Sequence, residues 1–302
     1  MTLPAILLVV ASAVLHAGWN LICKTQKSPC AVFFLILTVG SVFLWMPFAI
    51  WIFKSRQVEI PTLVWGMLVL SGLANAIYYV GLGSAYRISD ISISYPLVKA
   101  LPILIVTVFC IIFGAGKATL WGWVGISTLL MGSAFIPMKK FAAFSWKNYL
   151  NRSFGFVLAA AVASAGYMLL DNHGIKMLRA ASASLEKHQI SAVYIFFENL
   201  FILPFLLGFI MLRKEERGEL AAFVRNFSPA PFITGIMCTL SYSLVLMAMS
   251  LSSNVGMVVA LRQLSVPLGA FGGIVLLKEP GHMPKMVGAL SIVGGLILVC
   301  VG

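Results

Sequence analysis

The chain has 302 residues, of which 61% are hydrophobic and 10% are charged. An average soluble domain carries about 25% charged residues, so this composition excludes a water-soluble enzyme and an intrinsically disordered chain. The net charge is +12, but most charged residues fall in short segments between apolar runs, which favours lipid headgroups over nucleic acid as their partner. Because the apolar runs are continuous rather than alternating, the sequence predicts an all-α integral membrane protein.

Ten apolar runs follow one another along the chain, each near the length of about 20 residues that a spanning helix needs. The predicted spans are 3–22, 30–53, 62–85, 91–113, 119–138, 153–174, 190–212, 229–250, 255–277 and 284–301. The first run lacks the basic start of a signal peptide and further spans follow it, so it is predicted to be a transmembrane helix. The two longest polar stretches, 139–152 and 213–228, are too short to form soluble domains.

The two halves of the chain resemble each other in the positions of glycine, proline and aromatic residues. The matching pairs are Leu101-Pro102-Ile103 with Val266-Pro267-Leu268, Gly125 and Gly132 with Gly288 and Gly295, and Gly18-Trp19 with Gly166-Tyr167. Each half has five predicted spans, and duplication of an odd number of spans inverts the second copy in the membrane. The sequence therefore predicts ten transmembrane helices as two inverted five-helix repeats, 1–138 and 153–302, joined by a linker loop over 139–152.

A set of residues in both halves carries a resemblance to a known family. They are His16-Ala17-Gly18-Trp19-Asn20 with Lys24, Pro267, Leu276-Leu277-Lys278-Glu279-Pro280, Gly288 and Gly294-Gly295. On these residues, nearly the whole chain resembles the drug/metabolite transporter superfamily, in its EamA-type branch. It departs from the family at 114–117, where Gly-Ala-Gly-Lys stands in place of a frequent Glu. The resemblance implies a bacterial inner-membrane transporter of small metabolites, with a cavity between spans one, three, four, six, eight and nine.

Ionisable residues inside the spans are candidate functional residues, because each costs roughly 2.5–3.5 kcal/mol to insert. Lys99 and Arg262 each stand about one turn before a mid-span proline, in corresponding spans of the two halves. We expect these two cations to face one cavity and to bind an anionic group such as a carboxylate or a phosphate. The mid-span prolines are expected to let each helix bend or open there. In the alternative interpretation, the cations pair with Glu198 or Asp171 and only hold helices together.

Polar and aromatic residues on other spans complete the predicted site. Ser12, His16 and Asn20 share one face of the first span, and several tyrosines lie too deep in their spans to be interfacial anchors, which favours an aromatic-walled pocket. The predicted substrate-binding residues are Lys99, Arg262, His16, Trp19, Asn20, Asn75, Tyr78, Tyr95, Tyr167, Tyr242 and Gln263. His16, Glu198 and Asp171 are candidates for proton coupling, with a structural role as the alternative.

The sequence predicts a secondary active transporter, an exporter by family resemblance, for a small metabolite bearing an anionic group. An amino acid derivative or an organic acid fits this description, and transport would occur by alternating access. The alternative is a flippase for a lipid-linked or amphiphilic substrate. The sequence contains no known catalytic motif, so neither enzyme activity nor a cofactor or metal is expected. The expected partners are the metabolite and the lipid bilayer, without nucleic acid, and the chain is expected to be a monomer or a homodimer.

The sequence gives two conflicting indications of orientation. The family resemblance implies that both termini are cytoplasmic. In that orientation, however, the outer loops hold about twice as many Lys and Arg residues as the inner loops, against the positive-inside rule. Both indications place the two termini on the same side of the membrane.

Overall fold

The computed structural model describes residues 2–25, 30–88, 91–112, 119–136, 138–141, 153–252, 254–278 and 280–301, and no strand occurs in these ranges. The helices are α1 (Leu3–Thr25), α2 (Ala31–Ser55), α3 (Thr62–Ile88), α4 (Ile91–Ile112), α5 (Leu120–Phe135), α7 (Phe154–Ala181), α8 (Lys187–Leu212), α9 (Lys214–Arg225), α10 (Ala230–Leu251), α11 (Val255–Leu261), the 3-10 helix η2 (Arg262–Leu264), α12 (Ser265–Leu276) and α13 (Met283–Val301). Nine of the predicted spans each overlap one of these helices, the ninth span, 255–277, covers α11, η2 and α12, and most boundaries agree to within a few residues.

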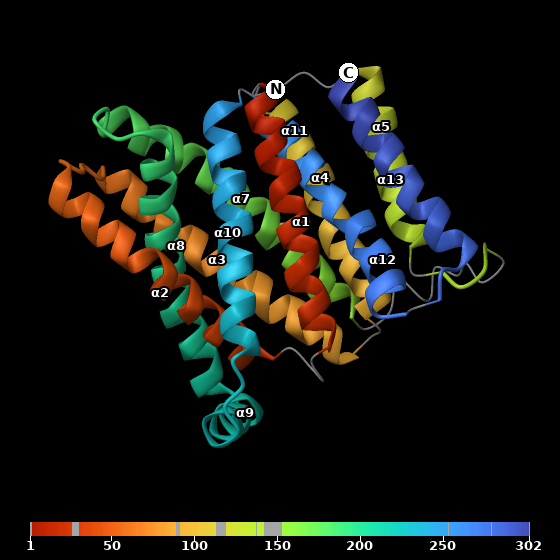
Figure 1. Ribbon diagram of the computed structural model, residues 1–302, viewed down its shortest axis with the longest axis horizontal. Helices are drawn as coiled ribbons and strands as arrows, with labels where there is room; N and C mark the ends of the chain where they lie inside the picture. The colour runs from red at the N-terminus through yellow and green to blue at the C-terminus, as the bar shows by residue number, and fades with distance from the viewer. Residues whose placement is uncertain are drawn as a thin grey trace.

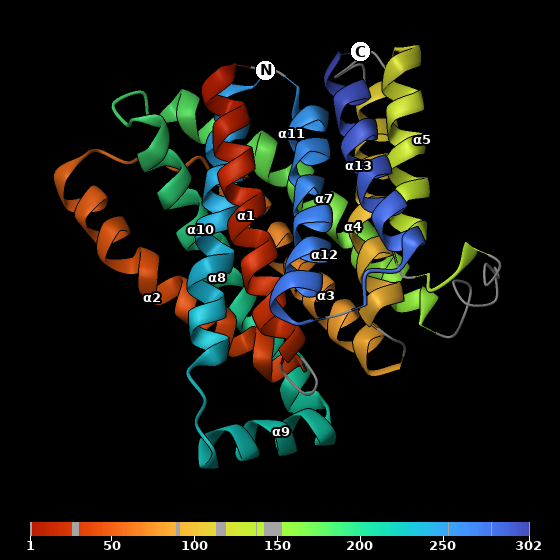
Figure 2. The same ribbon diagram turned by 45° about the vertical axis from the view of Figure 1, so that its right-hand side comes forward.

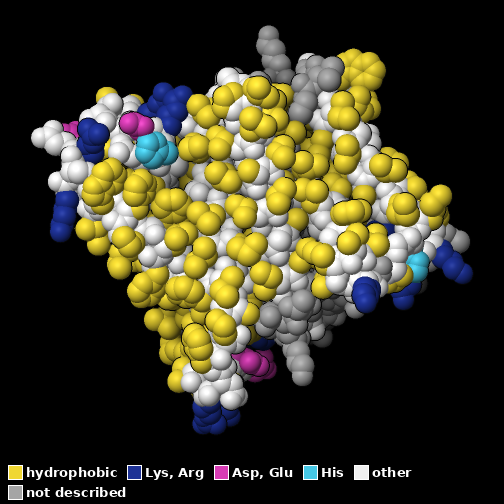
Figure 3. All heavy atoms as spheres, in the orientation of Figure 1, with side chains coloured by type: hydrophobic (Ala, Val, Ile, Leu, Met, Phe, Trp, Pro, Cys, Tyr) yellow, Lys and Arg dark blue, Asp and Glu magenta, His cyan; other side chains and the backbone are white. Residues whose placement is uncertain are grey.

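Seven helical segments in the described part of the chain are long and apolar enough to cross a membrane, and α5 and α13 are shorter apolar helices. Figure 3 shows hydrophobic side chains spread over the middle of one face, with Lys and Arg side chains at its margins. Large apolar side chains such as Leu7, Trp51 and Leu290 are more than half exposed. Exposed apolar surface of this extent suits lipid as the surrounding solvent. The protein is therefore a helical membrane protein.

Local sequence signals fix where several helices begin. The side chain of Glu186 accepts from the first turn of α8 while the backbone N–H of Glu186 donates to Oε1 of Gln189 at 3.0 Å, which forms a capping box. Oδ1 of Asn254 accepts the backbone N–H of Met257 at 3.2 Å and caps α11. The polar stretch predicted as a loop at 213–228 instead contains helix α9, which begins with Glu215 in its first turn and ends at Arg225, as the helix dipole favours.

The helices run between two ends of the molecule. The start of α1 and the end of α13 lie at one end, and α9 lies across the other end, roughly perpendicular to the bundle (Figures 1 and 2). Nη2 of Arg87, at the end of α3, contacts Oε1 of Glu216 in α9 at 2.7 Å. Glu216 is buried, so this ion pair ties α9 to the end of the bundle.

We expect reporter fusions at the N-terminus and the C-terminus to report the same side of the membrane. The first helix begins, and the last helix ends, at the same end of the bundle (Figure 1). A reporter active only in the cytoplasm and one active only outside it, each fused in turn to both termini, distinguish the two orientations. Termini found on opposite sides would overturn the ten-span arrangement.

Helices of the first half pack mainly against helices of the second half. In the centre, α3 packs on α7, α1 packs on α10, and α2 packs on α8. Further contacts join α4 to α7 and α1 to α12, α3 to α8 and α2 to α10. The buried residues that position the cavity therefore come from both halves.

The edge of the bundle is a tight pair of helices, α5 and α13, which lie side by side (Figure 1). Their contact runs through the four glycines that correspond in the two halves of the sequence. A Cβ atom on Gly132 would lie 2.7 Å from the carbonyl oxygen of Gly288, and one on Gly125 would lie 2.7 Å from that of Gly295. Small residues at such positions let two backbones approach closely inside a membrane.

Candidate functional site

The ninth predicted span is interrupted within its length. The helix changes from α to 3-10 at Arg262–Leu264 and returns to α at Ser265. Pro267 has no N–H, so it cannot donate to the carbonyl of Gln263 four residues earlier. The helix therefore changes its hydrogen-bond pattern before Pro267, and its 3-10 turn is tighter than the flanking α-helix. By contrast, α4 continues through Pro102 without such a change.

Arg262 points into the core of the bundle from this interruption and is only 7% exposed. Its guanidinium carbon lies 5.1 Å from the centre of the Tyr242 ring, a distance at which a cation is attracted to the ring face. Tyr167 lines the same cavity as Arg262. In the described part of the chain, no carboxylate forms an ion pair with Arg262, and its Nη1 atom has no hydrogen-bond partner.

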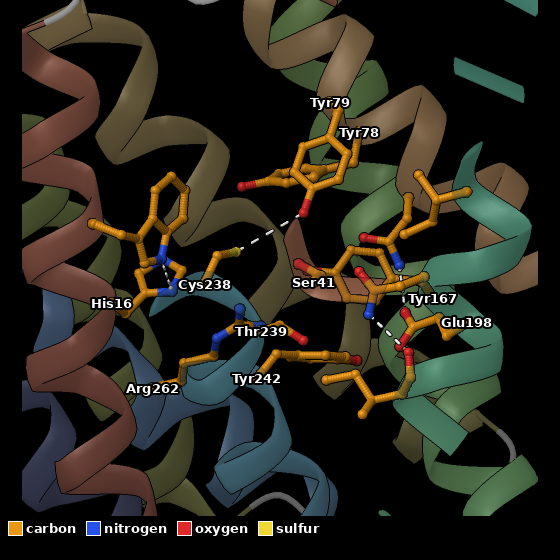
Figure 4. A pocket seen from close by; sticks show the side chains of 15 residues that line it. His16, Ser41, Tyr78, Tyr79, Tyr167, Glu198, Cys238, Thr239, Tyr242 and Arg262 are labelled. Carbon is orange, nitrogen blue, oxygen red and sulfur yellow. Dashed lines mark hydrogen bonds between the residues drawn. The ribbon is translucent and has the colours of Figure 1, made fainter. Parts of the chain in front are cut away.

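A small cavity lies next to Arg262, among helices α1, α2, α3, α7, α8 and α10. Its volume is about 30 Å³, which leaves room for water but not for a metabolite, because pockets for small organic ligands measure about 300–1,000 Å³. The side chains of the candidate site therefore lie close to one another in this conformation. Figure 4 shows Arg262 and His16 on one side of the cavity and Glu198 on the other, with Tyr242 between them.

The structure brings many of the residues predicted for the site together around this cavity. They are His16, Trp19, Asn75, Tyr78, Tyr167, Glu198, Tyr242 and Arg262. Gln263 lines a second, smaller space on the other side of Arg262, together with Val98 and Pro102 of α4. The side chains of Lys99 and Tyr95 lie outside the described residues, so the predicted pairing of Lys99 with Arg262 stays a prediction.

The polar face of α1 divides between two roles. Nε1 of Trp19 donates to Nδ1 of His16 at 3.2 Å, and both side chains face the cavity. Ser12 instead exchanges hydrogen bonds with Ser241, which joins α1 to α10. Nδ2 of Asn20 donates to the carbonyl of His16 in its own helix at 2.6 Å, and Asn20 does not line the cavity. Sharing one helical face does not place these three side chains in one site.

Neither Asp171 nor Glu198, the two buried carboxyl groups near Arg262, forms an ion pair with it. Asp171 accepts hydrogen bonds from Ser71 at 2.6 Å, from Tyr194 at 3.2 Å, and from the hydroxyl of Tyr242. Oε1 of Glu198 accepts from Nδ2 of Asn75 at 2.6 Å. The alternative in which the carboxylates neutralise Arg262 directly and hold helices together therefore does not describe this arrangement.

Several residues around the cavity were absent from the predicted site. They are Ser41, Tyr79, Ile195, Asn199, Ile202, Cys238 and Thr239. The family resemblance implied a cavity without contributions from spans two and seven, yet Ser41 belongs to α2 and Glu198 belongs to α8. The signal that favoured α8 was Glu198 itself, because an acidic residue in an apolar span is costly to insert. Ser41 offers no comparable signal, since serine is common at helix contacts in membranes.

Comparison with known proteins identifies a fold but not a family. No known protein family and no curated protein matches this chain. One solved structure, described only as the crystal structure of a protein, aligns with 98% of this chain and 96% of its own chain. The TM-score is 0.63 and the sequence identity is 13%. At this identity the likeness indicates a shared fold alone.

Proposed function

We propose that this protein is a secondary active transporter that moves a small metabolite bearing an anionic group across a bacterial inner membrane. The observation that carries the proposal is Arg262, a buried guanidinium beside the cavity that has no ion-pair partner in the described part of the chain. Its Nη1 atom also lacks a hydrogen-bond partner among those residues. An arginine in this setting suits a carboxylate or a phosphate, which its planar fork binds through paired hydrogen bonds.

The lining of the cavity supports a small organic cargo rather than a bare inorganic ion. The rings of three tyrosines form a row along its wall. The ring centres of Tyr78 and Tyr167 are 6.0 Å apart, and those of Tyr167 and Tyr242 are 5.7 Å apart. Aromatic walls with a few fixed polar groups are typical of sites for small molecules. The cargo we propose therefore combines an anionic group at Arg262 with an organic portion against the tyrosines.

Alternating access of two inverted repeats supplies the mechanism in this proposal. In the two proposed repeats, α1 corresponds to α7, α3 to α10 and α4 to α12. If each helix is replaced by its counterpart, the α1–α10 contact becomes the α7–α3 contact, and the α4–α7 contact becomes the α12–α1 contact. The α2–α8 and α5–α13 contacts each map onto themselves. A packing pattern that survives this exchange allows the repeats to swap conformations around a central site. Because the cavity holds only about 30 Å³, admission of cargo requires these helices to move apart.

Counterflow into proteoliposomes tests the proposal. Purified protein is reconstituted, liposomes are loaded with one unlabelled amino acid derivative, organic acid or phosphorylated metabolite, and uptake of the labelled compound is followed. Accumulation above protein-free liposomes, for at least one anionic compound and not for its neutral amide or alcohol analogue, supports an anion transporter. Absence of counterflow across the panel, with accelerated transbilayer movement of a fluorescent phospholipid, would favour the flippase alternative instead.

A further inference from the structure

Two carboxyl groups meet at one hydroxyl in the core of the bundle. Oγ of Ser71 lies 2.6 Å from Oδ1 of Asp171 and 3.4 Å from Oε1 of Glu198. Asp171 is 0% exposed and Glu198 is 1% exposed. Two negative charges this close in an apolar interior repel strongly, so one carboxyl of such a pair holds a proton.

The hydrogen bonds distinguish the two carboxyl groups. Asp171 accepts from three hydroxyls, those of Ser71, Tyr194 and Tyr242, and several donors aimed at one carboxyl stabilise its charged form. Glu198 has one short hydrogen bond, from Asn75, and its Oε2 atom has no partner among the described residues. The donors therefore favour the charge on Asp171 and leave the proton on Glu198, which lines the cavity while Asp171 does not.

His16 is less suited to carry this proton. Its Nδ1 atom accepts the N–H of Trp19, and a nitrogen that accepts a hydrogen bond is unprotonated. In a doubly protonated imidazole, Nδ1 of His16 would also carry a proton, and its N–H would then point at the N–H of Trp19. Of the three candidates for proton coupling, the geometry thus distinguishes Glu198 from both His16 and Asp171.

We propose that Glu198 carries an exchangeable proton, and that binding of an anion at Arg262 and protonation of Glu198 favour each other. This inference rests on the proposed function, and it names the coupling ion of the same site. The proton leaves Glu198 for water in the cavity, which has room for it. Among the described residues, the titratable and charged groups that share the cavity with Glu198 are His16, Tyr78, Tyr79, Tyr167, Cys238, Tyr242 and Arg262. Asp171 lies beside it through Ser71, and Tyr194 through Asp171.

Tyr242 connects the cation to the carboxyl pair. Its ring face lies against the guanidinium of Arg262, and its hydroxyl donates to Oδ2 of Asp171. With Glu198 protonated, Arg262 and Asp171 balance each other in charge. An anion bound at Arg262 cancels the positive charge, so a second negative charge on Glu198 becomes less favourable. The coupling free energy is the same in both directions, so protonation of Glu198 strengthens anion binding by the factor by which the anion strengthens proton binding. In a transport cycle, this coupling corresponds to movement of the anion together with a proton.

Infrared spectroscopy of the purified protein tests the first step without any cargo. In a detergent that lacks ester groups, we expect the carbonyl band of a protonated carboxylic acid near neutral pH, and we expect Glu198→Gln to remove it. Gln keeps an acceptor for Asn75, so the fold should be retained, and the unchanged amide bands of the variant check this. The matched control is Glu216→Gln, which removes a buried carboxylate that is paired with Arg87 and should leave the band in place. A band that survives Glu198→Gln overturns the assignment.

Replacement of Arg262 by Met imitates the neutralised cation and tests the second step. We expect the band of Glu198 to persist to a pH about one unit higher in Arg262→Met than in the native protein, because the cation that favours ionisation is gone. Arg225→Met removes an exposed arginine of α9 and should not move the pH at which the band disappears. An unchanged titration in Arg262→Met refutes the linkage. These readouts do not depend on transport, so a failure of the proposed function in liposomes remains distinguishable from a failure of this inference.

Discussion

Replacement of Arg262 by Met is expected to weaken binding of the anionic cargo that we propose by at least about tenfold. Met preserves most of the side-chain volume and removes the charge and all donors. A hydrogen bond to a charged group contributes about 1.5–3 kcal/mol, and about 1.4 kcal/mol corresponds to a factor of ten in affinity. Binding is measured as the concentration of anion that half-maximally stabilises the purified protein against heat. The same substitution at Lys99 is expected to have a similar effect, if that residue faces the site as the sequence predicts.

The fold of the Arg262→Met variant should be retained, because no carboxylate in the described part of the chain depends on Arg262 as an ion-pair partner. Arg225→Met serves as the control for loss of an arginine at the surface. Unaltered affinity in Arg262→Met, with both variants folded, would remove the main support for an anionic cargo.

Substitution of Gly132 by Ala is expected to lower the stability of the protein by about 1–3 kcal/mol. The new Cβ atom would lie 2.7 Å from the carbonyl oxygen of Gly288 and 3.0 Å from the backbone nitrogen of Ile292. Both are backbone atoms, so α5 and α13 must separate to accommodate the methyl group. The midpoint of thermal unfolding in detergent should fall by several degrees.

Gly66 provides a matched control for this substitution. It also lies within a helix, α3, but a Cβ atom there would meet nothing within 4 Å. Both substitutions gain the higher helix propensity of alanine, by about 0.8–1.0 kcal/mol, so the difference between the two variants reports the clash alone. Equal midpoints for Gly132→Ala and Gly66→Ala would show that the two helices are not in tight contact.

The positions of most helices were predictable, because a continuous apolar run of about 20 residues is by itself the sequence pattern of a spanning helix. The exception is α9, whose mixed sequence of charged and apolar residues was interpreted as a loop. Its apolar residues, among them Leu220 and Phe223, pack against the hydrophobic core, while its charged residues are mostly exposed. An amphipathic helix at the end of a bundle has low mean hydropathy, so a search for apolar runs passes over it.

The candidate site was predictable only in part, because spacing along one helix gives the face of a residue but not its partners on other helices. In the alternative interpretation Asp171 and Glu198 pair with cations, yet they accept hydrogen bonds from hydroxyls and an amide of neighbouring helices. The position of Ser71 between two carboxyl groups depends on how α3, α7 and α8 pack. Such three-helix contacts are a property of the tertiary structure and leave no pattern in a single sequence.

The lengths of the helices give the molecule an uneven hydrophobic thickness. At 1.5 Å per residue, the 16 residues of α5 extend about 24 Å and the 19 residues of α13 about 28 Å. The 25 residues of α2 and the 26 of α8 extend about 37 Å and about 39 Å. In the arrangement that we propose, the short pair lies at one edge of the bundle and α2 and α8 lie towards the other (Figure 1). A hydrocarbon layer of about 30 Å must then thin beside α5 and α13, while the long helices tilt. The lipids around this protein are thus deformed asymmetrically, and bilayer thickness becomes a determinant of how its helices tilt against one another.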